Sequence, residues 1–163
     1  MDKTGMTTVS IARNECAGSV FTAHREYSAR LEGRVVRDEV VGPVNMELLR
    51  LFHQRIAPLY QQAHANGPFV LLSHYYESIL MSPGALDGFV EAAGELIAVG
   101  IAPVAVAHVA GPEVEGREFM GDILRKKIFD PMCLPYQLFD NTDSAQRWLD
   151  EHLTKALDHD TNH

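Results

Sequence analysis

The chain has 163 residues and a formal charge of −8 at pH 7, from 22 acidic and 14 basic residues. A chain of this length fits one domain, which buries roughly two-thirds of the surface that its unfolded form exposes. Its 46% hydrophobic and 22% charged residues exclude a chain held open by self-repulsion. The acidic balance argues against nucleic acid as a partner, because phosphate contacts need clustered lysine and arginine.

No run of the sequence approaches the roughly 18 apolar residues of a membrane span, and residues 1–15 lack the apolar core of a signal peptide. Cys16 and Cys133 lie far apart, and neither belongs to a Cys/His cluster with metal-site spacing. We therefore expect a cytoplasmic protein with reduced thiols, no membrane span, no bound metal and no cofactor.

The first part of the chain predicts a hairpin followed by a helix. Residues 1–17 show no periodicity and are expected to form a flexible segment before a single domain at 18–157. Two strand-like stretches within 20–41 flank the turn-compatible pair Glu32-Gly33, which predicts a β-hairpin. Asn45 is the expected N-cap of the next helix, and Pro58 inside it predicts a kink or an early end near Ala57.

The rest of the chain alternates buried-strand patterns, at 69–72, 104–109 and 135–139, with helical ones. Ser82-Pro83 pairs an N-cap hydroxyl with a first-turn proline, which predicts a helix that Gly100 closes. Further helices are expected around 119–124 and after Asn141, and 158–163 are expected to form a loose tail. The helix after Ser82 is expected to bury Leu86, Phe89, Val90, Ala93 and Ile97.

This element order predicts an α/β fold with a single mixed β-sheet. An N-terminal antiparallel hairpin is followed by right-handed βαβ crossovers and by a C-terminal helix. No internal repeat or linker divides the chain.

The order and the residues at its joints resemble STAS domains, and more closely the stand-alone bacterial SpoIIAA-like proteins of unassigned function. The matching segments are 41–45, 69–72 and Phe139 followed by 145–149, within a likeness that covers about residues 19–157. The resemblance implies a cytosolic binding or regulatory module without chemistry of its own. Such a module acts through a protein partner, sometimes with a small apolar ligand.

One segment departs from the classical members of that family, which carry Asp-Ser-Ser-Gly with a phosphorylated second serine. Here the segment reads Met81-Ser82-Pro83-Gly84, so proline stands at the acceptor position. The resemblance therefore does not imply a phosphorylation switch, and Ser82 is expected to act as a helix cap.

Candidate binding residues follow the predicted strands, because ligands of open α/β sheets bind beyond the carboxyl ends of the strands. His74 and His108 could approach each other if their strands are neighbours, although a histidine in an apolar segment is often a buried group with one hydrogen bond. Tyr75 and Tyr76 are adjacent in a predicted loop, where paired aromatics either anchor a partner or cover the core.

The predicted loop from Ser73 to Pro83 is longer than the 2 to 6 residues usual for such connections. Its apolar residues would form a patch for a second copy of the chain, a protein partner or an apolar ligand if they stay exposed. The candidate ligand- or partner-binding residues are His74, Tyr75, Tyr76, Leu80, Met81, Ser82 and His108.

The alternative interpretation is a small cytosolic enzyme, a hydrolase or transferase that uses His74 or His108 as general base. No Gly-x-Ser-x-Gly nucleophile elbow, helical metal-binding pair or phosphate-binding glycine loop supports this alternative. We therefore assign no catalytic residue from the sequence.

Overall fold

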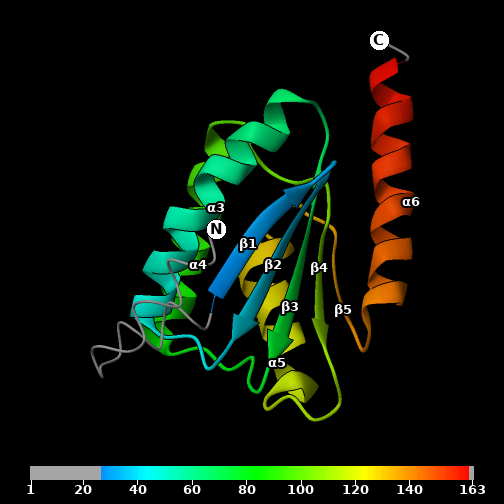
Figure 1. Ribbon diagram of the computed structural model, residues 1–163. Coiled ribbons are helices and arrows are strands. Elements are labelled where there is room, and N and C mark those ends of the chain that lie inside the picture. Colours follow the sequence, from blue (N-terminus) through cyan, green and yellow to red (C-terminus); the bar gives the residue numbers. More distant parts are fainter. Residues whose placement is uncertain (1–26, 162–163) are drawn as a thin grey trace, which may run out of the picture.

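The computed structural model describes residues 27–161, and they form one mixed sheet with strand order β1-β2-β3-β4-β5 (Figure 1). β1 and β2 pair antiparallel and every other pairing is parallel, which confirms the predicted α/β fold with its N-terminal hairpin. The expected flexible segment 1–17 and the start of the domain lie outside the described residues. The strands are β1 (Tyr27–Glu32), β2 (Val35–Val41), β3 (Val70–Tyr76), β4 (Val106–Ala110) and β5 (Tyr136–Phe139).

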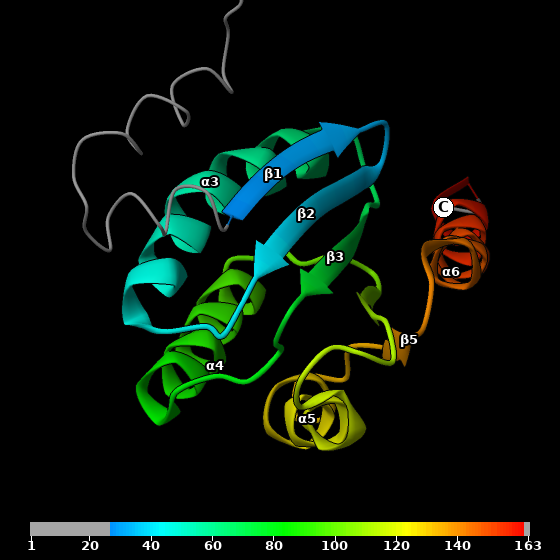
Figure 2. The same ribbon diagram turned by 60° about the horizontal axis from the view of Figure 1, so that its bottom comes forward.

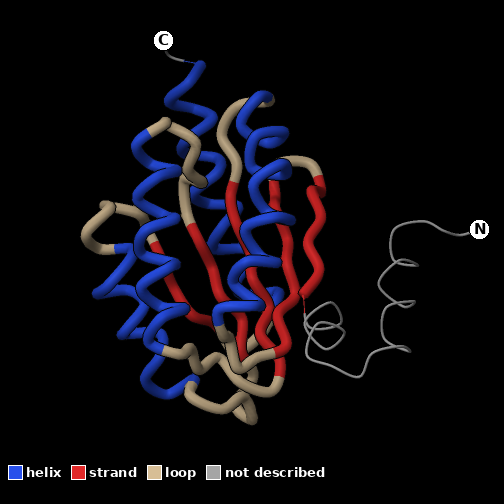
Figure 3. The backbone as a smooth tube through the Cα atoms, turned by 90° about the vertical axis from the view of Figure 1, so that its left-hand side faces the viewer, coloured by secondary structure: helices blue, strands red, loops and turns tan. Residues whose placement is uncertain are grey.

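The helices cover the two faces of the sheet unequally. Helices α3, α4 and α5 lie on one face and α6 lies alone on the other (Figure 2), and Figure 3 looks at the sheet from the side of α3 and α4. Two separate hydrophobic clusters result, one on each face. The helical segments are α3 (Met46–Ala65), α4 (Pro83–Ala98), α5 (Arg117–Leu124), the π-helical turn η1 (Arg125–Phe129) and α6 (Thr142–Thr161).

Two helices begin at the caps that the sequence predicts. The side chain of Asn45 accepts a 2.9 Å hydrogen bond from the Leu48 backbone N–H, and Ser82 Oγ accepts one of 3.2 Å from the Ala85 N–H. Each bond satisfies one of the backbone donors that the first helical turn leaves without a partner. The segment between β3 and α4 is therefore fixed where α4 begins.

The sequence predicts that Pro58 causes either a kink or an early end of helix α3 near Ala57. The helix does not end there but continues through Pro58 to Ala65. Pro58 is exposed, and so is Gln54, whose carbonyl loses its helical donor to the proline. Water can satisfy that carbonyl, while Ile56 and Tyr60 on either side stay buried in the core. Tertiary packing thus outweighs the local effect of the proline.

Helix α4 departs from the sequence prediction in its burial. Ala85 is its only buried residue, and the expected stripe is partly buried at most, with Ile97 36% exposed. The backbone of α4 lies closest to α3 and η1, and its partly buried apolar side chains pack against the main hydrophobic core. The backbone of α4 is therefore farther from the strands than that of α3.

Two elements extend beyond their predicted ends. β3 includes residues 73–76, which the sequence analysis places in a loop, so the connection to α4 is only 77–82 and has an ordinary length. Isolated bridges pair Met81 with Val44 and Ser78 with Glu115, which ties this connection down. At the other end of the chain, α6 continues through 158–161, where a loose tail was expected.

Candidate functional site

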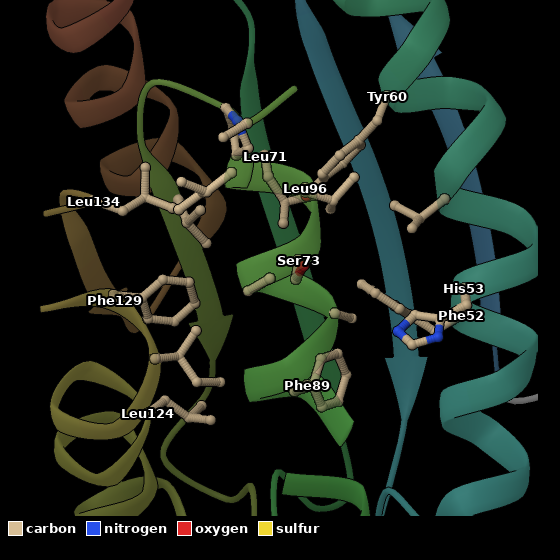
Figure 4. A pocket seen from close by; sticks show the side chains of 18 of the residues that line it. Phe52, His53, Tyr60, Leu71, Ser73, Phe89, Leu96, Leu124, Phe129 and Leu134 are labelled. Carbon is tan, nitrogen blue, oxygen red and sulfur yellow. The ribbon is translucent and has the colours of Figure 1, made fainter. Parts of the chain in front are cut away.

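A cavity of about 420 Å³ lies between the sheet and the helices α3 and α4, closed on a third side by the end of α5 and by η1 (Figure 4). Its volume is within the range of about 300–1,000 Å³ that small-molecule sites occupy. Apolar and aromatic side chains form most of the wall. They include Phe52, Ile56, Tyr60, Leu71, Tyr75, Met81, Phe89, Leu96, Val106, Leu124, Ile128, Phe129 and Leu134.

Small side chains form part of the cavity wall. Ala92 and Ala93 of α4 and the exposed Ala57 of α3 line the space, and none of them reaches far from its helix. Empty apolar space of this size is uncommon in protein interiors, which are close-packed. A packing gap of this kind therefore calls for an explanation beyond stability.

Three polar residues form a row across the sheet on the cavity side. Strand register pairs Asp38 of β2 with Ser73 of β3, and Ser73 with His108 of β4. Side chains of register partners point to the same face of a sheet. All three are buried, at 1%, 2% and 5% exposure, in a face that is otherwise apolar. Ser73 and His108 line the cavity, and Asp38 lies next to them in the core.

Asp38 has one firm partner. The Tyr27 hydroxyl donates a 2.8 Å hydrogen bond to Oδ2, whereas Oδ1 has no hydrogen-bond partner among the described residues. Ser73 is close enough to favour the charged carboxylate, although the two side chains do not meet ordinary hydrogen-bond geometry. Burial outweighs the help from Ser73 and Tyr27, and it raises the pKa of Asp38 to about 7.

His108 is held in a fixed orientation by the aromatic residues around it. Its Nδ1 shares a 2.9 Å hydrogen bond with the Tyr136 hydroxyl, and the rings of Tyr75 and Tyr136 both pack 4.9 Å from the imidazole. Burial lowers the pKa of His108 to about 3. The side chain is therefore an uncharged imidazole at neutral pH.

Asp38, Ser73 and His108 are the three residue types of a hydrolytic triad, but their order across the sheet differs from that of a triad. A triad needs histidine between acid and nucleophile, so that the acid orients the ring and the ring takes the nucleophile's proton. Here Ser73 stands between Asp38 and His108, and Tyr136 occupies the ring nitrogen that an acid would hold. The geometry suits hydrogen bonding to a bound molecule better than proton transfer.

His53 is a fourth polar residue, placed on α3 where the cavity lies between α3 and α4 (Figure 4). Its Nε2 is buried without a hydrogen-bond partner among residues 27–161. Burial lowers the pKa of His53, and the negative charge of Glu95 on α4 opposes that shift. His53 and Glu95 are thus the polar residues nearest to the α3–α4 boundary.

The structure separates the residues predicted from sequence. Tyr75, Met81 and His108 line the cavity, while Leu80 packs against the core and Ser82 caps α4.

His74 and Tyr76 lie on the opposite face of the sheet from His108, with their rings stacked at 4.3 Å. β3 and β4 are neighbours as expected, but His74 pairs with Val109 and not with His108. Alternation along a strand sends adjacent residues to opposite faces, so the two histidines do not share a pocket.

Sequence reasoning did not identify Asp38, His53 or Tyr60 as residues of this region. A signal for Asp38 was present, because it alternates with Val36 and Val40 and so occupies an inward position of a strand. A carboxyl group at such a position is uncommon unless it is paired. Nothing in the sequence marks His53 in the same way.

No protein-family model, no curated protein and no solved structure matches this chain. Within residues 27–161, none of the helices combines the length and the apolar character needed to cross a bilayer.

Proposed function

We propose that this protein is a binding module that holds one small, largely apolar molecule in the cavity beneath α4. The observation that carries the proposal is a partly open, largely apolar cavity of about 420 Å³ lined by α3, α4, the end of α5, η1 and the sheet. Filling such a space restores the contacts that its wall lacks and removes the ligand's apolar surface from water. The resemblance to SpoIIAA-like proteins favours the same proposal, since it implies a binding module.

A route into the cavity is provided at the carboxyl end of α4. Ile97 and Val99 line the cavity and are also 36% and 67% exposed, so the wall reaches the surface there. Because no strand pairs with α4 and its backbone lies farther from the sheet than that of α3, its last turns can move without breaking strand pairing. We infer that the ligand enters past these two side chains.

The direct test fills the cavity from α4. Ala93→Trp places a large ring in the space, and Glu91→Trp, at an exposed position of the same helix away from the cavity wall and from the entrance, is the control. Prodan, an uncharged naphthalene dye of suitable size, reports binding by its emission. We expect one saturable site in the wild type and in Glu91→Trp, and at least about tenfold weaker binding in Ala93→Trp.

Thermal unfolding in the same samples checks that all three proteins are folded. Bound dye should raise Tm in the wild type and in Glu91→Trp, because a ligand that binds only the folded state stabilises it. Equal prodan affinity in all three folded proteins would contradict the proposal. Turnover of a substrate that depended on His108, found in an activity screen, would favour the enzyme interpretation instead.

A further inference from the structure

We propose that the ligand is an uncharged molecule with an apolar body and a single hydroxyl group, and that Ser73 and His108 together bind that hydroxyl. The inference depends on the proposed function, because it specifies what the same cavity accepts. Three features carry it: the charges of the wall, the position of its polar atoms and its volume.

The wall offers no positive charge to an acidic ligand. The lining residues include no lysine or arginine, and the one formally charged side chain among them is Glu95 at the α3–α4 boundary. Moving an ionised group into apolar surroundings without a counter-charge is strongly unfavourable. A carboxylate would also be repelled by Glu95, so a fatty-acid-like anion does not fit this cavity.

The polar side chains on the sheet side are those of Ser73, Tyr75 and His108, and two of them, Ser73 and His108, lie side by side. Ser73 and His108 are register partners on adjacent parallel strands, and both line the cavity. His108 uses Nδ1 to bond Tyr136, and no hydrogen bond joins its Nε2 to any residue in the described part of the chain. A hydroxyl is both donor and acceptor, as is Ser73, while the Nε2 of a neutral imidazole supplies whichever role its tautomer allows.

One ligand hydroxyl can therefore bond to both residues, since it accepts from one partner and donates to the other. Apart from the hydroxyls of Tyr60 and Tyr75, the rest of this part of the wall is apolar, so a second polar group placed against it would be buried without a partner.

The volume of the cavity limits the size of the ligand. About 420 Å³ holds on the order of 14 groups the size of water, at about 30 Å³ each.

The test compares two molecules of the same shape that differ only in the proposed group. In 2-naphthol a hydroxyl replaces the methyl group of 2-methylnaphthalene, so both fill the cavity similarly. Ser73→Ala removes the serine partner. The matched control is Ser78→Ala, which removes a buried serine outside the cavity wall.

We expect Ser73→Ala to weaken 2-naphthol binding about fivefold, the effect of one hydrogen bond, and to leave 2-methylnaphthalene binding unchanged. Ser78→Ala should not alter the ratio of the two dissociation constants. Charged relatives, 2-naphthoate and 2-naphthylmethylammonium, should bind at least about tenfold more weakly than 2-naphthol to the wild type. Calorimetric titration measures all four affinities.

The outcomes separate the two proposals. If neither naphthalene binds at a saturable site, the proposed function itself is wrong. If both bind but Ser73→Ala changes their affinities by the same factor, or changes neither, the cavity binds apolar molecules and the hydroxyl inference is wrong. Tighter binding of either charged relative than of 2-naphthol would also overturn the inference.

Discussion

The hydroxyl of Tyr27 donates to Oδ2 of Asp38 at 2.8 Å, in the core between the first two strands, while Oδ1 of the same carboxyl group has no hydrogen-bond partner among residues 27–161. The hydrogen bond from Tyr27 thus offsets only part of the free energy that it costs to bury the Asp38 carboxylate. Its pKa is raised from 3.8 to about 7. Folding therefore favours the protonated form of Asp38.

This linkage predicts that Asp38 lowers stability as pH rises. Below pH 4 the group is protonated in both states, and between about pH 4 and 7 only the unfolded state releases the proton. The stability contributed by protonation is therefore lost as pH rises through this window. Asp38→Asn cannot ionise, so its free energy of unfolding relative to the wild type should rise by up to about 4 kcal/mol from pH 4 to pH 7.

Urea unfolding at several pH values measures this difference. Glu39→Gln is the control, because Glu39 is the exposed neighbour of Asp38 on the same strand. Its difference from the wild type should show no comparable rise. A constant difference between Asp38→Asn and the wild type would mean that the carboxyl group titrates normally.

His108 predicts the opposite pH dependence. Its pKa is lowered by burial from 6.5 to about 3, so the unfolded state binds a proton first as pH falls. The stability associated with the neutral ring is fully present above pH 6.5 and is lost between about pH 6.5 and 3. At pH 5 this loss amounts to about 2 kcal/mol.

His108→Gln should remove that acid-dependent loss, even if the variant is less stable at pH 7 because the bond to Tyr136 changes. The quantity to compare is the change in unfolding free energy from pH 7 to pH 5, measured by urea unfolding. His64→Gln, at an exposed position of α3, should retain the wild-type change. Equal changes in all three proteins would show that His108 is not buried as a neutral ring.

The cap of α4 gives a prediction that does not depend on the cavity. Ser82→Ala removes the bond to the Ala85 N–H and should cost about 1 kcal/mol of stability, whereas Ser82→Gly should cost a few tenths. Ser28→Ala, at an exposed strand position, should be near neutral. Chemical unfolding checks the order. Stoichiometric phosphate on Ser82 in protein from its native cell would contradict a purely structural role.

The two faces of the sheet should respond independently. Leu149 of α6 is fully buried in the cluster on the face opposite the cavity. Leu149→Ala should destabilise the protein by about 2–5 kcal/mol and leave prodan affinity unchanged. Lys155→Ala, at an exposed position of α6, is the control for stability. A large loss of affinity in folded Leu149→Ala would show that the sheet transmits changes between its faces.

The fold was predictable because its signals are local. The apolar run at 69–72, the Val-rich stretch of β2 and the caps Asn45 and Ser82 each indicate an element without knowledge of its neighbours. Alternating strands and helices then limit the topology to βαβ crossovers. Of the two outcomes expected at Pro58, a kink or an early end, the early end is wrong, because buried residues on both sides of the proline hold the helix together.

The site was less predictable because it depends on register and on the distance between layers. His74 and His108 look equivalent in sequence, and only the extension of β3 to Tyr76 and its pairing with β4 place them on opposite faces. Likewise, the apolar stripe of α4 is typical of a helix packed on a sheet. The cavity between them is lined from α3, α4, η1 and the sheet together, and no short segment encodes that arrangement.

The position of α4 has a consequence for how such a protein could change its ligand. The size of the cavity depends on short helix side chains such as Ala92 and Ala93, whereas its polarity depends on Ser73 and His108 in the strands. Enlarging or trimming a side chain on the helix leaves the backbone pairing of the strands untouched. The helices therefore determine the size of the ligand and the strands determine its polar group. Mutations in one of these elements can change one property of the ligand while the other stays the same.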